Sequence, residues 1–191
     1  CAVDSRNQQA VLRTAESFGL QDVWIVHSPV TRNAAAAKDQ YGKDMSKKQR
    51  FCSGASLWLT VRWFDDTPSC IKALRDEGYS IWATDLSPVA KCISRISSSE
   101  LPSERLAVVM GREVDGVSQT MLEASDQRVY LDMYGFTESF NLSVASALVL
   151  HCLFEKCPAA RGDMAAERKR ELREQWYHEL YRKTKSQGAK Q

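Results

Sequence analysis

The sequence predicts an α/β fold in which a parallel sheet is flanked by helices. Short apolar segments of strand length alternate along the chain with stretches of helical periodicity. Strands that are separated by such helices require crossover connections, which are right-handed and place the helices over the faces of a parallel sheet. The chain has 191 residues, enough for one domain that buries roughly 70% of the surface exposed by the unfolded chain.

The first part of the chain is predicted to contain one helix and two strands. Residues 7–18 carry apolar side chains on one helical face, and Gly19 ends the helix. Residues 23–27 are a short apolar run, and residues 57–64 also have the composition of a strand. Between them, residues 31–50 lose most of their large apolar side chains, which predicts a segment that is mobile or faces a partner.

The second part of the chain is predicted to add three strands and four helices. Residues 106–110 are continuously apolar, as is typical of a strand in the middle of a parallel sheet with both faces covered. Leu172, Trp176 and Leu180 form a stripe on the last helix, so this helix packs on the domain or on a second copy. The other elements are helices over 68–77, 118–124 and 163–185 and strands over 79–84 and 128–131.

Residues 133–147 lead from a glycine-bearing loop into an apolar helix. Ser139, Asn141 and Ser143 place polar atoms where a helix leaves its first N–H groups unpaired. Such a terminus can hold a ligand as easily as it caps itself. Ligands of α/β sheets bind beyond the carboxyl ends of the strands. Three residues are expected there: Thr84, Gly111 and Met133.

Common nucleotide and hydrolase motifs are not found in the sequence. Residues 111–116 resemble a phosphate loop in outline, but no Gly-Lys-Ser/Thr follows, and no GxGxxG follows the first strand. None of the three histidines has a catalytic-triad motif around it. By itself, the glycine pair at 111 and 116 indicates a tight turn.

Positive charge is concentrated in two segments. Residues 31–50 carry six Lys/Arg against two Asp/Glu, and residues 161–191 carry nine against five, although the net charge of the whole chain is only +2. Two basic patches on a nearly neutral body suit a polyanionic partner. Charge alone favours the alternative that both are solvated surface segments.

The six cysteines show no CxxC pair and no metal-ligand spacing with the histidines, so we expect reduced thiols and no metal site. The longest apolar run, residues 142–154, is shorter than the roughly 20 residues that a bilayer requires.

The chain begins at Cys1 without a recognisable leader, and we expect that an upstream segment is missing. The expected location is a reducing compartment: the cytoplasm, or a mitochondrion or chloroplast if the missing segment is an address.

Three segments in this order resemble the motifs of the SpoU/TrmH branch of the SPOUT RNA methyltransferases. They are NQQAVLRTAESFG at 7–19, GREVDGVS at 111–118 and MYGFTESFNLSVASA at 133–147. GYSIWATDLS at 78–87 also resembles the strand and loop that precede the second motif. The likeness covers residues 2 to about 156. Within this branch, the chain resembles the tRNA guanosine 2'-O-methyltransferases.

The resemblance implies a SPOUT domain over 1–156, with a deep trefoil knot at about 80–156, and a basic helical extension over 157–191. It implies that S-adenosyl-L-methionine binds in the knot and that the protein is a homodimer. The implied activity is 2'-O-methylation of a ribose in structured RNA, with tRNA as the first expectation and rRNA as the second. A heterodimer with a related chain is the alternative assembly.

The resemblance also assigns site residues. The cofactor site would be lined, largely through backbone atoms, by Thr84, Gly111, Leu131, Met133 and Phe140. The residues gathered around the methyl group and the target ribose would be Asn7, Arg13, Glu113, Ser139 and Asn141. Methyl transfer from a sulfonium needs no metal, but the ribose oxygen must be held in line and stabilised as it loses its proton. Arg13 suits this purpose as a fixed cation rather than as a base, because a guanidinium does not readily deprotonate.

This chain departs from the family pattern at three positions. Arg112 replaces the usual amide residue of the second motif, Asp132 replaces a proline before the third, and Phe140 replaces a leucine. We therefore expect an ion pair between Arg112 and Asp132 that shapes the pocket. The same two departures motivate the rival hypothesis, a knotted RNA-binding or ribosome-assembly factor that has weak or no activity.

Overall fold

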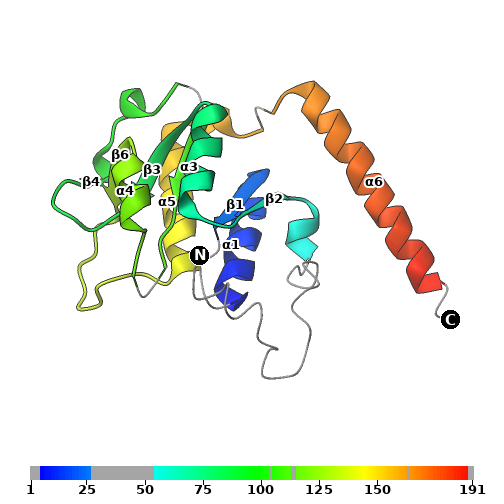
Figure 1. The fold of residues 1–191 in the computed structure, drawn as a ribbon, viewed down its shortest axis with the longest axis horizontal. Helices are drawn as coiled ribbons and strands as arrows, with labels where there is room; N and C mark the ends of the chain where they lie inside the picture. The colour runs from blue at the N-terminus through cyan, green and yellow to red at the C-terminus, as the bar shows by residue number, and fades with distance from the viewer. Residues whose placement is uncertain (1–4, 27–53, 104, 113–114, 163, 189–191) are drawn as a thin grey trace.

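A computed structural model of the chain describes residues 5–26, 54–103, 105–112, 115–162 and 164–188. They form an α/β fold in which parallel strands are covered by helices on both faces, as predicted (Figure 1). One sheet has four strands in the order β4-β6-β3-β5, and a second sheet has two strands, β1 and β2. All of the paired strands are parallel.

The amino-terminal elements are α1 (Ser5–Ser17), β1 (Asp22–Val26) and β2 (Thr60–Phe64). They confirm the predicted helix and the first predicted strand. The strand predicted over 57–64 begins three residues later than expected, because Gly54–Leu57 forms a 3-10 helix, η1. The basic segment predicted at 31–50 lies outside the described residues.

The next helix, α3 (Thr67–Asp76), is limited at both ends by its local sequence. Asp66 caps its start by accepting a hydrogen bond from the Ser69 backbone N–H at 2.8 Å. Gly78 follows its end with a φ of +75°, a conformation that glycine adopts without strain. The chain then enters β3 (Tyr79–Thr84), which has the predicted bounds.

The segment between β3 and β5 contains structure that the sequence did not predict. It forms a short strand, β4 (Lys91–Cys92), and two 3-10 helices, η2 (Ile93–Arg95) and η3 (Ser98–Glu100). The remaining elements are β5 (Arg105–Val109), α4 (Gln119–Ala124), β6 (Gln127–Tyr130), α5 (Leu142–Lys156), the 3-10 helix η4 (Pro158–Ala160) and α6 (Ala166–Gly188).

The expectation that residues 106–110 form a central strand is wrong. β5 lies at one end of the four-stranded sheet, and β3 and β6 occupy the centre. Arg105 of β5 is exposed and the other residues of the strand are half-buried, because one edge of the strand pairs with β3 while residues 106–110 line a cavity shared with β1. An apolar cavity wall therefore has the same composition as a strand with both faces covered.

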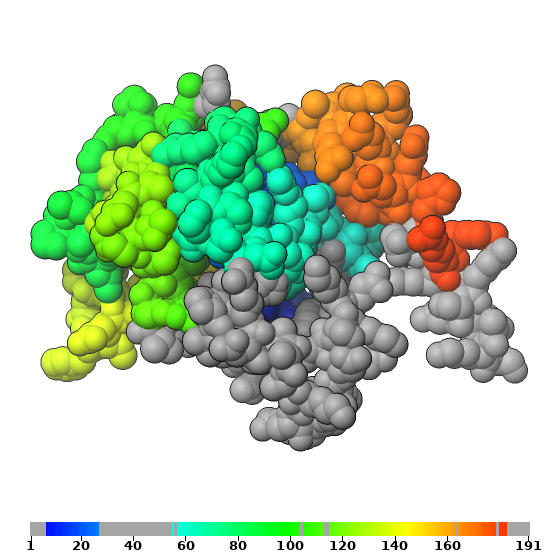
Figure 2. Space-filling view, in the orientation of Figure 1, coloured from blue at the N-terminus to red at the C-terminus, as the bar shows by residue number. Residues whose placement is uncertain are grey.

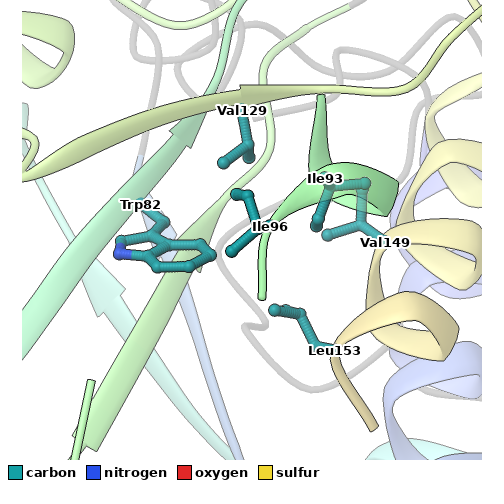
Figure 3. Packing of buried hydrophobic residues seen from close by; sticks show 6 residues of the cluster. All are labelled: Trp82, Ile93, Ile96, Val129, Val149 and Leu153. Atoms are coloured by element: carbon teal, nitrogen blue, oxygen red, sulfur yellow. The ribbon is translucent and has the colours of Figure 1, made fainter. Parts of the chain in front are cut away.

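Adjacent residues of β3 point into two different cores. Trp82 packs with Val129 of β6, Val149 and Leu153 of α5, and the buried Ile93 (Figure 3). Ile81 packs on the opposite face of the sheet with residues of α3 and α4: Cys70, Leu74 and Met121. This alternation places α5 on one face of the sheet and α3 and α4 on the other.

The carboxyl-terminal helix α6 projects from the body of the molecule (Figure 1). Leu172 is buried, and the Trp176 ring packs edge-on against Trp58 with ring centroids 5.5 Å apart. The first two residues of the predicted stripe, Leu172 and Trp176, therefore pack on the domain, as predicted. Leu180 and the neighbouring Tyr177 are exposed.

The described cysteines are free thiols, at positions 70, 92, 152 and 157. Burial raises the pKa of the Cys70 thiol to about 11, so this thiol stays protonated at neutral pH. Among the described helices, none has the length and apolar character needed to cross a bilayer. The same described residues contain no group of three or more His, Cys, Asp or Glu side chains that could hold a metal ion.

Candidate active site

Three of the predicted cofactor residues follow neighbouring parallel strands. Thr84 ends β3, Gly111 follows β5 by two residues, and Leu131 directly follows β6. Because β3 pairs in parallel with both β5 and β6, these residues lie at the same edge of the sheet. The Thr84 hydroxyl donates to the Val109 carbonyl oxygen at 3.2 Å, which ties the ends of β3 and β5 together.

Gly111 is required by the close approach of the turn that follows it. A Cβ atom at this position would lie 2.4 Å from the Gly116 carbonyl carbon and 2.5 Å from the Val117 nitrogen. The turn is closed by two backbone hydrogen bonds between Arg112 and Gly116, at 3.0 and 2.9 Å. Gly116 itself has a φ of +65°. The sequence prediction of a tight turn between the two glycines is therefore confirmed.

The loop between β6 and α5 is open to solvent. The Tyr134 and Phe136 side chains are fully or almost fully exposed, and Phe140 is 37% exposed. Figure 2 shows this part of the chain, yellow-green to yellow, standing out from the body. Within the described part of the chain, the backbone of residues 133–140 makes no hydrogen bond. Its N–H and C=O groups can therefore be offered to a ligand.

Asp85 anchors the loop that leaves β3 beside Thr84. Its carboxylate accepts hydrogen bonds from the Ser87 hydroxyl at 2.5 Å and from the Arg128 guanidinium at 3.2 Å. Burial acts to raise the pKa of Asp85, but the hydrogen bonds from Ser87 and Arg128 outweigh it and lower this pKa. The carboxylate is therefore charged at neutral pH and holds the loop.

Asn141 brings the third motif into contact with the first. It is the N-cap of α5, and its side-chain oxygen accepts a hydrogen bond from the Ser143 backbone N–H at 3.0 Å. The Asn141 side-chain nitrogen donates to Oδ1 of Asn7 at 3.2 Å. Two of the predicted catalytic residues, 134 positions apart in the sequence, are thus joined directly.

The other predicted catalytic residues are not part of this contact. Arg13 is exposed on α1 and makes no hydrogen bond or ion pair with another described residue. Asn7 lies inside α1, six positions before Arg13 and about 240° away around the helix axis, so the two side chains point in different directions. Ser139 is exposed and makes no hydrogen bond within the described part of the chain. Glu113 lies outside the described residues.

The expected ion pair between Arg112 and Asp132 is wrong. Arg112 binds the Asp115 carboxylate, with its Nε 2.6 Å from Oδ1, because Asp115 lies across the same tight turn. Asp132 instead accepts hydrogen bonds from the Arg95 guanidinium and the Cys92 thiol, both at 3.2 Å. Both charges of the unusual pair are compensated by local partners.

A cavity of about 410 Å³ lies beside Arg112 and Asp115. Its walls come from α1, β1, β5, α4 and α5, and polar side chains of Gln8, Arg112, Asp115 and Ser118 also line it. No site role was predicted from the sequence for Gln8, Asp115 or Ser118. Their position in the motif segments, one residue after Asn7 or within GREVDGVS, was the available signal.

The sequence profile of the SpoU rRNA Methylase family matches residues 2–151. The chain belongs to this family. The match includes every residue that the sequence analysis assigned to the site, and it confirms the predicted relationship. The knot that is typical of SpoU methylases remains a prediction for this chain.

Named relatives of this SpoU family member include two bacterial enzymes. The tRNA (guanosine(18)-2'-O)-methyltransferase of Borreliella burgdorferi is 30% identical over 178 residues, which cover 92% of this chain and 74% of that protein. The 23S rRNA (guanosine(2553)-2'-O)-methyltransferase RlmP of Bacillus subtilis is 34% identical over 151 residues, covering 78% of this chain and 54% of that protein.

Solved structures of SpoU proteins share the fold of this chain. The A. aeolicus TrmH/SpoU tRNA modifying enzyme aligns with a TM-score of 0.70 at 20% identity, covering 94% of this chain and 85% of that chain. The SpoU methyltransferase AviRb from Streptomyces viridochromogenes, solved in complex with AdoMet, aligns with a TM-score of 0.60 at 17% identity, covering 83% and 58%. These likenesses confirm the α/β SpoU fold.

Proposed function

We propose that this protein is an S-adenosyl-L-methionine-dependent RNA methyltransferase that methylates a ribose 2'-oxygen, in tRNA first and in rRNA second. The observation that carries the proposal is the contact between Asn7 and Asn141 beside the carboxyl edge of the sheet. Membership of the SpoU family supports it. The relatives named above are tRNA and rRNA guanosine 2'-O-methyltransferases.

The residues at the carboxyl edge fit S-adenosyl-L-methionine. The backbone groups of residues 133–140, which have no hydrogen-bond partner within the described chain, can bind its polar atoms. The exposed Phe140 ring offers an apolar surface to its adenine. In our proposal the residues that hold it are Thr84, Gly111, Leu131, Met133 and Phe140. When bound, it supplies a methyl carbon on a positively charged sulfur.

The Asn7 and Asn141 amides are proposed to hold the target ribose. S-adenosyl-L-methionine would supply the methyl group, whose bond to sulfur breaks as its bond to the ribose 2'-oxygen forms, and the proton of the 2'-hydroxyl would be released to solvent. The residues of this chain would therefore have to hold the 2'-oxygen in line with the bond that breaks. Asn141 is held by its cap hydrogen bond to Ser143 and by its contact with Asn7, and both amides are therefore rigidly placed. The exposed hydroxyl of Ser139 is proposed to bind the ribose, and Glu113 is proposed to order the turn of the second motif.

We further propose that the protein acts as a homodimer. Arg13 points away from the Asn7–Asn141 contact of its own chain, so we infer that it serves the site of the partner as the fixed cation. Exposed apolar side chains support a second copy as a partner, because such side chains in number mark an interaction surface. They lie on α5 and on the loop after β3: Val144, Leu148, Leu86 and Val89.

The C-terminal extension is proposed to contact RNA phosphates. Some of its basic side chains form ion pairs along α6. Arg168 pairs with Glu171 at 3.1 Å, and Arg170 pairs with Glu167 at 2.5 Å. Exposed pairs of this kind are weak, about 0.5 kcal/mol, so phosphates can displace them. Phosphate contacts position an RNA without specifying its sequence.

Two measurements test the proposed activity. Titration calorimetry should detect binding of S-adenosyl-L-methionine, and transfer of its labelled methyl group to bulk tRNA should give a 2'-O-methylated nucleotide after nuclease digestion. RNA binding without transfer would favour the rival role as an inactive RNA-binding factor. Absence of both cofactor binding and methyl transfer would refute the proposal that the protein is an enzyme. Light scattering distinguishes the homodimer from a chain that requires a related partner.

A further inference from the structure

The loop between β6 and α5 is held next to both of its ends. Residues 133–140 make no backbone hydrogen bond within the described part of the chain. Asn141 fixes the carboxyl end through its contact with α1. Asp132 fixes the amino end, because its Oδ2 atom accepts a hydrogen bond from the Cys92 thiol and another from the Arg95 guanidinium, each at 3.2 Å. The loop is therefore suspended between two anchored residues.

Both donors to Asp132 come from a segment that is fixed in the core. β4 runs parallel to β6, and Cys92 is paired with Tyr130, two residues before Asp132. Cys92 itself is buried. Ile93 and Ile96 follow in the same segment and pack in the core with residues of β3 and α5 (Figure 3). Asp132 is therefore bound to a well-packed part of the molecule rather than to another loop.

An aspartate leaves the backbone at position 132 less restricted than a proline would. Asp132 stands where the family pattern has a proline, whose ring would fix the φ torsion. The two hydrogen bonds of the Asp132 side chain restrict the chain at the same point. Ordering a loop costs conformational entropy, so a loop that is ordered before its ligand arrives binds that ligand more tightly.

We propose that Asp132 is a positioning residue for S-adenosyl-L-methionine, and that its bonds to Cys92 and Arg95 hold the start of the 133–140 loop in the conformation that binds the cofactor. This role rests on the proposed function, in which these loop residues form part of the cofactor site. Asp132 acts through the loop and is not assigned a contact with the cofactor. Its two partners lie outside the motif segments, so the affinity for the cofactor depends on a part of the chain to which the motifs assign no role.

Titration calorimetry and single-turnover kinetics separate positioning from chemistry. Asp132→Ala removes both hydrogen bonds and should raise the Kd for S-adenosyl-L-methionine about 10-fold. The rate of transfer at saturating cofactor should stay within about 2-fold of wild type, because no group at the reacting atoms is removed. Arg95→Gln removes one exposed donor and should raise the Kd by only about 2-fold. An unchanged Kd in Asp132→Ala overturns the inference, as does a loss confined to the rate.

A proline substitution distinguishes an effect on the loop from the loss of a contact. Asp132→Pro removes the carboxylate but fixes φ at about −65°, so the Kd should be lower than that of Asp132→Ala. Arg95→Gln should have no further effect in this background, because its partner has been removed. A Kd equal to that of Asp132→Ala overturns the proposed role. If Asp132→Pro does not fold, Asp132→Asn takes its place, since its amide oxygen still accepts and the Kd should again lie below that of Asp132→Ala.

Lys91→Gln is the matched control for Arg95→Gln. Lys91 donates to the Glu100 carboxylate at 2.9 Å, so this pair also joins a cation of the 91–100 segment to a carboxylate, but it does not include Asp132. The Kd should be unchanged in Lys91→Gln, and an increase equal to that in Arg95→Gln would overturn the inference. Absence of cofactor binding by the wild-type protein would count against the proposed function. Wild-type binding that Asp132→Ala does not weaken overturns the positioning role alone.

Discussion

The Asn141 side-chain nitrogen donates to Oδ1 of Asn7 at 3.2 Å, while the Asn141 side-chain oxygen accepts from the Ser143 backbone N–H at 3.0 Å and from the Ser143 hydroxyl at 2.7 Å. One amide therefore caps α5 and joins it to the first turns of α1. Because the oxygen is committed to the cap, the NH₂ group must face Asn7. The geometry of the proposed ribose site and the start of α5 depend on the same side chain.

The two roles of Asn141 can be separated by substitution. Asn141→Asp keeps the oxygens that cap α5 but removes the donor to Asn7, so the free energy of unfolding should change by less than about 0.5 kcal/mol. Methyl transfer should fall roughly 100-fold, because a misplaced orienting group costs that much. Asn141→Ala should lose activity and about 1 kcal/mol of stability. Urea denaturation and single-turnover kinetics measure the two effects.

The N-cap of a different helix, α3, provides the control for Asn141. Asp66→Ala removes the side chain that accepts from the Ser69 backbone N–H at the start of α3. It should destabilise the protein by about 1 kcal/mol without changing the rate of methyl transfer. If Asp66→Ala slows transfer as much as Asn141→Ala does, the activity loss reflects stability rather than the contact with Asn7.

Two glycine substitutions test whether the turn after β5 leaves no room for a Cβ atom at Gly111. In Gly111→Ala the new Cβ would meet the backbone of Gly116 and Val117 at 2.4–2.7 Å, so the turn must open. Overpacking against backbone that cannot move aside should cost about 3 kcal/mol or more. Gly135→Ala has no atom within 4 Å of the added Cβ and should leave the melting temperature unchanged. Thermal unfolding of both variants measures the difference, and equal melting temperatures would contradict it.

Local sequence signals were sufficient to predict an element where a terminating residue such as glycine agrees with the pattern of apolar residues. β3 has the predicted bounds because Gly78 precedes it and its apolar residues pack on both faces of the sheet. The segment with β4, η2 and η3 was missed because Ile93 and Ile96 are isolated apolar residues in a serine-rich stretch. Their complete or nearly complete burial results from packing against Trp82 and α5 rather than from a local pattern.

The candidate site was predictable in part. Motif position identified Asn7 and Asn141, and the structure places them in contact. Charge complementarity alone suggested an Arg112–Asp132 pair, but it does not say which partner lies nearest. Asp115 is three residues from Arg112 across a tight turn and therefore forms the pair. The cavity depends on how β1 and β5 face each other, which no sequence window contains.

The observed ion pairs make a prediction for double-mutant cycles. Asp132 pairs with Arg95 and not with Arg112, so the effects of Arg112→Gln and Asp132→Asn on cofactor affinity should add. Arg95→Gln and Asp132→Asn should be less than additive, with a small coupling because Arg95 is well exposed. Calorimetry on the single and double variants gives both values. A coupling between Arg112 and Asp132 above that of Arg95 and Asp132 would be inconsistent with the structure.

Asp126 predicts a pH dependence of folding. Its carboxylate accepts hydrogen bonds from Arg75, at 2.7 and 2.9 Å, and from the Ile81 backbone N–H at 2.7 Å, and these lower its pKa below the ordinary value. A folded-state pKa below the unfolded value stabilises the protein at higher pH, and this contribution is lost as the pH falls below about 4. Asp126→Asn should therefore cost about 1 kcal/mol near neutral pH, a value reduced for exposure, and less in acid. Urea titrations at about pH 7 and pH 3 measure the change, and a cost that grows in acid would refute this assignment.

The docking of α6 on the domain gives the last prediction. Leu172 is only 2% exposed, and Trp176 packs edge-on against Trp58. Leu172→Ala should cost about 2–3 kcal/mol and release the helix, because a buried leucine loses both its transfer free energy and its packing. Tyr177→Ala, at a position that is 68% exposed on the same helix, should change the stability by less than about 0.5 kcal/mol. Hydrogen exchange on α6 should speed up in Leu172→Ala alone, and equal exchange in the two variants would show that Leu172 does not hold the helix in place.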